Sequence, residues 1–249
     1  MQAEGTFGIL HLVYLVLSIV AFVLAFYFTR NAKKSEKVKT RVARVSGAIL
    51  LFFILANRIC VTYYDVEVNS RAGYTWLNLI PNTFCGLASL TLSLTLLLGK
   101  KDSVVLHCIA YLGILGGFVT MIYPDFLDSQ DFFDIRSLTG LLHHTMMVWC
   151  VIEAIRNGWM APTLRRFFCY PLGMCIVMTF GVFEMDCFDF KKAMQIGEPL
   201  LKSEPVLTSW YIVGLISVVL LFVFLVAYES ITRKVSVKSV LKSAFFGKS

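Results

Sequence analysis

Charged residues are scarce in this sequence. They make up 16% of its 249 residues, whereas a soluble domain usually carries about 25%. They also fall in short clusters between long apolar runs, and only a lipid bilayer stabilises so many wholly apolar helices in one chain. This composition excludes an ordinary soluble domain and predicts an all-α, polytopic membrane protein. Because no shift in composition and no long linker divides the chain, we expect residues 1–249 to form a single transmembrane domain.

Several motifs of well-understood chemistry are absent. The sequence contains no HExxH zinc motif, no P-loop and no GxSxG nucleophile elbow. Its last apolar run contains no lysine, which argues against a rhodopsin-type photoreceptor because a retinal Schiff base needs one. Neither His143 nor His144 is followed five residues later by aspartate, so the His-x4-Asp signature of soluble-type acyltransferases is also missing. We expect no cofactor and no bound metal ion.

Seven apolar segments are long enough, or nearly long enough, to cross a membrane as helices, which takes about 20 residues. They are residues 7–28, 45–64, 76–98, 104–123, 137–155, 164–183 and 207–228. The first segment is too long for a cleaved signal peptide, and its basic residues follow it instead of preceding it. We therefore expect seven retained transmembrane helices.

The basic residues predict how these helices are oriented. Seventeen lysines and arginines fall on one side of the seven segments, and only five fall on the other: Arg71, Arg136, Lys191, Lys192 and Lys202. The richer side is cytoplasmic by the positive-inside rule. We expect a multi-pass protein of the cell membrane with its N-terminus outside and its C-terminus inside. Six or eight spans would break the alternation.

The net charge of +7 has the same origin, since the basic residues line the cytoplasmic side and continue into a basic tail at 230–249. Anionic lipid attracts such residues by about 1 kcal/mol each. We therefore expect anionic lipid at the cytoplasmic face, and no nucleic acid, as a partner. In the tail, Lys234, Lys238 and Lys242 recur every four residues, which indicates a short helix on the membrane surface.

Polar side chains within the apolar segments are candidate site residues, because burying them in a bilayer is costly. Asn78, Asn82 and Cys85 have the spacing i, i+4 and i+7, which puts them on one face of the third segment. Pro81 lies among them and frees a backbone carbonyl. Arg58, in the second segment, needs an anionic or carbonyl partner or a lipid phosphate, unless it extends to the outer interface.

Histidines in two other segments complete the candidate set. At about 1.5 Å of rise per residue, His11, Arg58, Cys85 and His144 lie at similar depths in the outer half of their segments. We expect them to converge on one pocket that opens to the outer leaflet. Adjacent helical residues point about 100° apart, so at most one of His143 and His144 points fully into it. A membrane cysteine is more often a packing residue than a nucleophile, and both interpretations of Cys85 stay open here.

Short motifs in a fixed order resemble a known family. Residues 7–11 read FGILH, residues 80–87 read IPNTFCGL, residues 123–125 read YPD, and residues 193–199 read AMQIGEP. Over about residues 7–228 the chain is similar to the bacterial YwaF-type membrane proteins, which are related to the TMEM164-like proteins. Pro81 and Cys85 match the family pattern Leu-Pro-x-His-x-Cys, although Thr83 replaces its histidine.

The resemblance implies lipid chemistry. Its eukaryotic members are associated with fatty-acyl transfer onto phospholipids by a cysteine and a histidine, which correspond here to Cys85 as nucleophile and His144 as base. The implied partners are membrane phospholipids or lysophospholipids. The residues expected to bind substrate are Arg58, Asn82, Asn78, His11 and His143.

Two other functions use the same polar pocket. One is a carrier or transporter of a small molecule or lipid, and the other is a seven-helix receptor or sensor. Neither requires Cys85 to act as a thiolate, and this distinguishes both from the enzyme.

Overall fold

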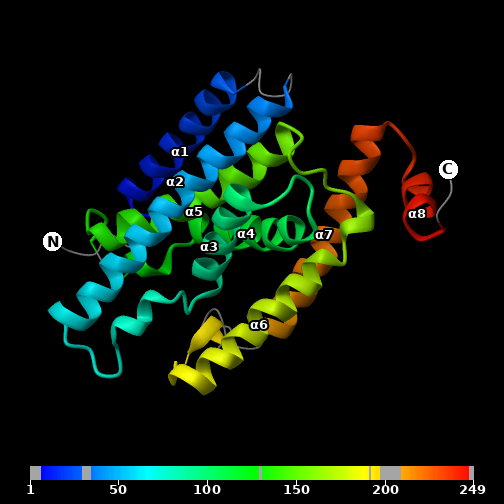
Figure 1. The fold of residues 1–249 in the computed structure, drawn as a ribbon. Coiled ribbons are helices and arrows are strands. Elements are labelled where there is room, and N and C mark those ends of the chain that lie inside the picture. The colour runs from blue at the N-terminus through cyan, green and yellow to red at the C-terminus, as the bar shows by residue number, and fades with distance from the viewer. Residues whose placement is uncertain (1–6, 30–34, 129–130, 191, 197–208, 247–249) are drawn as a thin grey trace. The chain divides into compact units, whose positions relative to one another are not determined.

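The computed structural model describes residues 7–29, 35–128, 131–190, 192–196 and 209–246, and these residues form helices without any strand (Figure 1). The all-α prediction is therefore confirmed for the described part of the chain. The main helices are α1 (Ile9–Phe28), α2 (Glu36–Tyr63), α3 (Phe84–Leu98), α4 (Val104–Ile122), α5 (Ile135–Arg156), α6 (Cys169–Phe188), α7 (Trp210–Arg233) and α8 (Val237–Phe246). Residues 207–208 of the last expected span, and residues 197–199 of the last motif, lie outside the described residues.

Six of the described helical segments are long and apolar enough to cross a membrane, which identifies a multi-pass membrane protein. They contain α1, α2, α4, α5, α6 and α7. Of the seven expected spans, the third contains α3, which has only 15 residues and is therefore about 22 Å long at about 1.5 Å per residue. The apolar core of a bilayer is about 30 Å thick, so a seventh crossing and the direction of the helices stay predictions.

The chain divides into two compact units. The first contains residues 1–100 and 113–159, and thus α1, α2, α3, α5 and the second half of α4. The second contains residues 101–112 and 160–249, and thus the first half of α4 together with α6, α7 and α8. That the whole chain forms one domain stays a prediction.

In the first unit, α2 packs against both α3 and α5, and α1 runs beside α5 (Figure 1). The core between them includes the fully buried Leu50 of α2, Leu92 of α3 and Met147 of α5. An added Cβ at Gly47 of α2 would lie 2.9 Å from the Cβ of Leu96 in α3. A glycine at this position therefore allows the two helices to approach closely.

Helix α2 begins nine residues before the expected second span. The basic connection after the first span is helical from Glu36 onward, and Lys39 pairs with Glu36 at 2.7 Å. Glutamate, lysine and arginine are good helix formers. A basic cluster therefore marks where an apolar segment ends, but not where its helix ends.

The helix expected over residues 76–98 is interrupted at Pro81. A 3₁₀ turn spans Trp76–Leu79, and Ile80 is extended with φ −64° and ψ 128°, as expected for a residue before proline. Helix α3 then begins at Phe84, where Thr83 is its N-cap and accepts a hydrogen bond from the Gly86 N–H at 3.2 Å. Cys85 consequently lies in the first turn of α3.

In the second unit, polar contacts join α6, and the 3₁₀ turn Leu164–Arg166 that precedes it, to α7 and α8. Tyr170 of α6 donates to Ser217 of α7 at 2.6 Å, and the carboxylate of Glu229 in α7 accepts from the Leu164 N–H at 2.9 Å. The side chain of Arg165 donates to the Ser243 carbonyl of α8 at 3.0 Å, and Val240 of α8 is buried. The expected tail helix is therefore present as α8.

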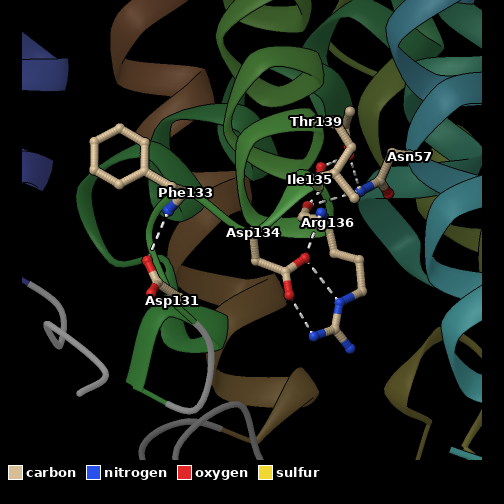
Figure 2. Close-up of polar contacts among 7 residues, drawn as sticks. All are labelled: Asn57, Asp131, Phe133, Asp134, Ile135, Arg136 and Thr139. Carbon is tan, nitrogen blue, oxygen red and sulfur yellow. Dashed lines mark hydrogen bonds and ion pairs between the residues drawn. The ribbon is translucent and has the colours of Figure 1, made fainter. Parts of the chain in front are cut away.

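The start of α5 is fixed by Asp134 (Figure 2). Its carboxylate accepts from the Arg136 N–H at 2.8 Å and pairs with the Arg136 side chain at 2.5 Å. Asn57 of α2 donates to the Arg136 carbonyl at 3.2 Å and to the Thr139 hydroxyl at 3.1 Å. These contacts set the register of α5 against α2, and thereby the position of His143 one turn further along.

The Asp134–Arg136 pair predicts a pH dependence of stability. The hydrogen-bonded guanidinium of Arg136 holds the pKa of Asp134 below its ordinary value. The pair therefore stabilises the fold above the unfolded-state pKa of about 3.9, and this stabilisation is lost as the pH falls through the folded-state pKa. We expect Asp134→Asn, which can still cap the helix, to lower the thermal midpoint of the detergent-solubilised protein at pH 7, with the gap to wild type narrowing toward pH 3.

Asp131→Asn is the matched control. The Asp131 carboxylate accepts one backbone hydrogen bond, from Phe133 at 3.0 Å, and the described residues include no cation paired with it. If the thermal midpoint of Asp134→Asn differed from that of wild type by the same amount at every pH, the ion pair would not be the cause of the difference.

Candidate functional site

Arg58 bridges α2 to the interruption before α3. Its side chain is buried and donates to the backbone carbonyls of Asn78 and of Ile80, the latter at 3.3 Å, and to the Asn82 side-chain oxygen at 3.4 Å. Pro81 has no N–H and breaks the helical ladder, so these carbonyls lack helical partners. An anion, a carbonyl or a lipid phosphate was expected to bind Arg58, and the structure shows that it binds backbone carbonyls.

Asn78 and Asn82 lie on the same turn. The Asn78 side-chain oxygen accepts from the Thr75 N–H at 2.8 Å and closes a capping box with the Thr75 hydroxyl. Arg58, Asn78 and Asn82 are thus brought together, although the single helix face expected to carry Asn78, Asn82 and Cys85 is interrupted at Pro81. Binding of substrate by Arg58, Asn78 and Asn82 stays a prediction. Their bonds are mostly to the backbone of this turn, so the three side chains fix where α3 begins.

Cys85 is partly buried and faces α4. Its Sγ lies 3.8 Å from the Thr120 hydroxyl, and an added Cβ at Gly116 would lie 3.0 Å from Sγ. As the second residue of α3, Cys85 lies where the free N–H groups of the helix favour negative charge. The helix end therefore favours negative charge on the sulfur, whereas burial of the side chain opposes it.

The two histidines of α5 stack on each other, with ring centroids 4.0 Å apart and an angle of 36° between the rings. His143 Nδ1 lies 3.1 Å from the Thr139 carbonyl. A carbonyl only accepts, so Nδ1 carries the proton and Nε2 is left as an acceptor. His143 Nε2 and His144 Nδ1 are both buried, and neither has a hydrogen-bond partner among the described residues. Buried ring nitrogens in this state are suited to bind a polar group or to exchange a proton.

Cys85 and His144 pack against adjacent residues of α4. Cys85 meets Gly116, whereas an added Cβ at Gly117 would lie 3.2 Å from the His144 backbone carbonyl. Within the described residues, the hydrogen-bond partner of Cys85 is Thr120 and not His144. Gly116 and Gly117 point about 100° apart on α4, and the Gly117 contact is with the His144 backbone, so these contacts do not bring the thiol to the imidazole. The catalytic roles of Cys85 and His144 stay predictions.

His11 is held by other contacts. Its Nε2 donates to the Met121 carbonyl at 2.9 Å, while its Nδ1 accepts from the Phe7 N–H at 3.2 Å. Both ring nitrogens are thus occupied, and His11 ties α1 to the end of α4. Binding of substrate by His11 stays a prediction.

Thr120 and Gly116 contribute to the site but are not among the residues that the sequence predicts for it. They are four residues apart and so share one face of α4. The sequence does contain a signal for them, because a glycine lies one turn before a threonine in a mainly apolar helix. That signal does not point to Cys85 unless one knows that α3 lies against this face of α4.

A metal ion has no evident site in the described part of the chain. It contains no group of three or more histidine, cysteine, aspartate or glutamate side chains that could hold one.

Comparison with known proteins identifies one family. Residues 6–228 match the model of the TMEM164 family, so the family relationship inferred from the short motifs is confirmed over most of the chain. The relationship to bacterial YwaF-type proteins in particular stays a resemblance. No curated protein and no solved structure matches the chain.

The contacts of Arg58 predict a large effect of its removal. Arg58→Met leaves the Asn78 and Ile80 carbonyls without their donor, and each buried polar group left unsatisfied costs about 1–3 kcal/mol. We expect a clear fall in the thermal midpoint of the detergent-solubilised protein, together with faster proteolysis between residues 75 and 83.

Arg44→Met is the matched control, because Arg44 is an exposed arginine of the same helix, α2. Substitutions at exposed positions usually change stability by less than about 0.5 kcal/mol, so this variant should resemble wild type. Equal stability of the Arg58 and Arg44 variants would show that Arg58 does not hold the turn.

Proposed function

Since the chain belongs to the TMEM164 family and is a multi-pass membrane protein, we propose that it transfers a fatty acyl chain between membrane lipids through a thioester on Cys85. The observation that carries this proposal is the position of Cys85. It occupies the first turn of α3, where free backbone N–H groups favour a negatively charged sulfur, and it packs on Gly116 of α4. Covalent catalysis also needs a base, and the candidate is His144 of α5, whose backbone carbonyl lies beside Gly117.

The reaction has two steps. His144 takes the thiol proton, and the Cys85 thiolate attacks the carbonyl carbon of a phospholipid ester. The carbon–oxygen bond breaks, the leaving oxygen takes the proton from His144, and a lysolipid departs. His144 then takes the proton of a second lysolipid hydroxyl, whose oxygen attacks the thioester, and the thiolate leaves and regains the proton.

The thiol has to change partner during this cycle. It lies 3.8 Å from the Thr120 hydroxyl in the resting structure, and reaction requires it to turn from Thr120 toward the imidazole. Catalytic hydrogen bonds often tighten only when substrate is bound. Thr120 then serves as the resting partner that satisfies the thiol between turnovers.

The neighbouring polar groups suit the rest of a lipid substrate. Arg58 and Asn82 meet at the turn before Cys85, and a guanidinium there attracts a headgroup phosphate or stabilises the ester oxygen. His143 Nε2 is a buried acceptor without a partner among the described residues, so it can accept from a lysolipid hydroxyl. Acyl chains already lie in the bilayer, and no soluble acyl carrier is required.

The proposed topology has seven spans in the cell membrane, with the N-terminus outside and the C-terminus in the cytoplasm. Helix α3 is short for a span, and the Trp76–Leu79 turn and Pro81 supply the remaining depth. Irregular backbone at membrane depth is tolerated where protein groups satisfy it, as Arg58 does here. In this topology Cys85 faces the outer half of the bilayer, and substrate enters sideways from the outer leaflet.

Helix α8 gives the protein a second proposed lipid partner. Its apolar side chains Val237 and Phe245 are exposed beside the exposed Lys238 and Lys242. A helix with an apolar face flanked by lysines lies in the membrane interface and binds anionic lipid. We assign α8 to the cytoplasmic surface of anionic membranes.

The thiol chemistry predicts selective labelling at Cys85. A lipid-like cysteine-reactive probe should label Cys85 strongly in wild-type membranes. Labelling at this position should be absent in Cys85→Ala and weaker in His144→Ala, because the base is missing. Peptide mapping by mass spectrometry reads out the modified residue. Cys175→Ala, which removes an exposed cysteine of α6, is the control and should leave labelling of Cys85 unchanged.

Equal labelling of Cys85 in wild type and His144→Ala would remove the base from the mechanism. Absence of labelling at Cys85 in wild type would identify it as a packing residue. The polar cluster would then fit a lipid carrier better than an enzyme.

The assignment of α8 predicts lipid-dependent protection of the tail. In nanodiscs, chymotrypsin should cleave after Phe245 and Phe246 several-fold more slowly with anionic than with zwitterionic lipid. The double variant K238Q/K242Q should lose this difference, whereas K100Q/K101Q, which changes another basic pair, should keep it. Protection that does not depend on lipid charge would contradict the assignment.

A further inference from the structure

The link between α7 and α8 exposes a serine. Helix α7 ends at Arg233, and its C-cap Lys234 adopts the left-handed conformation with φ 54°. Ser236 directly precedes α8, and its hydroxyl accepts a hydrogen bond from the Ser239 N–H at 3.3 Å. Every residue from 231 to 239 is exposed. Ser236 is therefore accessible to another protein at the start of a helix.

Basic residues lead up to this serine. Arg233 and Lys234 lie three and two residues before Ser236, and Lys238 lies two residues after it. Arg233 pairs with Glu229 of α7, but 48% of its side chain stays exposed. A protein kinase with carboxylates in its substrate groove selects a serine preceded by such cations, because the carboxylates pair with them. The helix ends on both sides of the link fray, which lets the chain extend into the groove.

The proposed role of α8 depends on the charge of the same segment. Residues 230–246 include no aspartate or glutamate, so Lys234, Lys238 and Lys242 supply charge for the binding to anionic lipid. A phosphoserine carries about −1.5 to −2 charges at pH 7 and would cancel about half or more of the charge of these three lysines. The start of a helix favours negative charge. Phosphorylation of Ser236 would thus leave α8 helical but weaken its attraction to the membrane.

We propose that Ser236 is phosphorylated by a protein kinase with an acidic substrate groove, and that the phosphate releases α8 from anionic membranes. The Ser236 oxygen attacks the γ-phosphorus of ATP, the bond to the β-phosphate oxygen breaks and ADP leaves. The hydroxyl proton passes to a carboxylate of the kinase. The release, but not the phosphorylation, rests on the proposed assignment of α8 to anionic membranes. The site uses neither Cys85 nor His144 and is therefore independent of acyl transfer.

The first experiment tests the modification site with the full chain in nanodiscs. The protein is incubated with ATP and the catalytic subunit of cAMP-dependent protein kinase, which selects basic residues at these positions before a serine. Phosphopeptide mapping by mass spectrometry should locate the phosphate on Ser236, and Ser236→Ala should carry none in this segment. Ser239→Ala, which changes an exposed serine within α8, is the matched control and should be phosphorylated like wild type. Absence of phosphate from Ser236 in wild type would overturn the proposal.

The second experiment tests the release of α8. Chymotrypsin cleavage after Phe245 and Phe246 is compared before and after phosphorylation. We expect cleavage to become several-fold faster in nanodiscs of anionic lipid and to stay unchanged in zwitterionic ones. Ser236→Asp, which supplies negative charge without a kinase, should also accelerate cleavage in anionic nanodiscs. Ser236→Asn caps a helix equally well without charge and should match wild type.

The outcomes separate the two proposals about α8. Phosphorylated Ser236 with cleavage that stays slow in anionic nanodiscs would overturn the release alone. Cleavage that is equally fast in both lipids before phosphorylation would overturn the assignment of α8 and with it the release, while the peptide mapping still decides the modification site. Equal acceleration by Ser236→Asp and Ser236→Asn would show that loss of the serine, and not added charge, frees the helix.

Discussion

The contact between Arg58 and the turn at Pro81 is the interaction on which the rest of the proposed site depends. A proline inside an apolar segment leaves backbone carbonyls without helical partners, and a bilayer offers no water to replace them. The Arg58 side chain of α2 donates to the Asn78 and Ile80 carbonyls. The chain can therefore end the Trp76–Leu79 turn, pass Pro81 and begin α3. Cys85 lies in the first turn of α3 only because the helix begins there.

A second constraint is the pair of adjacent glycines in α4, which have no side chains and so allow neighbouring helices to approach closely. Gly116 leaves room for the Cys85 sulfur, and Gly117 leaves room for the His144 backbone. The same principle operates in the second unit, where Gly173 brings α6 against Cys108. Small residues allow close helix contact in membranes, where dispersion and polar contacts replace the hydrophobic effect. Two of these contacts, those of Gly116 and Gly173, also place a cysteine at the helix interface.

The sequence predicted the features that follow from local composition. Apolar length identified the six long helices, the spacing of three lysines identified the tail helix, and the ordered motifs identified the family. It did not predict that α2 starts at Glu36, because charge marks the membrane boundary and not the helix end. Pro81 signalled a break, but a break and a kink leave the same pattern in the sequence. The Cys85–Thr120 contact depends on which helices touch, and no periodicity within one helix contains that information. The similar depths of His11 and Cys85 in their segments predicted that they share a pocket, yet His11 bonds to the Met121 carbonyl instead.

The central claim is that Cys85 carries the acyl chain between lipids, and acyl exchange by the purified protein tests it most directly. Wild type and Cys85→Ser would be reconstituted in liposomes with a phospholipid whose acyl chain is isotopically labelled and with an unlabelled lysophospholipid. The account predicts labelled product and a hydroxylamine-sensitive acyl group on Cys85 in wild type, and neither in Cys85→Ser. Transfer at an undiminished rate by a folded Cys85→Ser protein would contradict it.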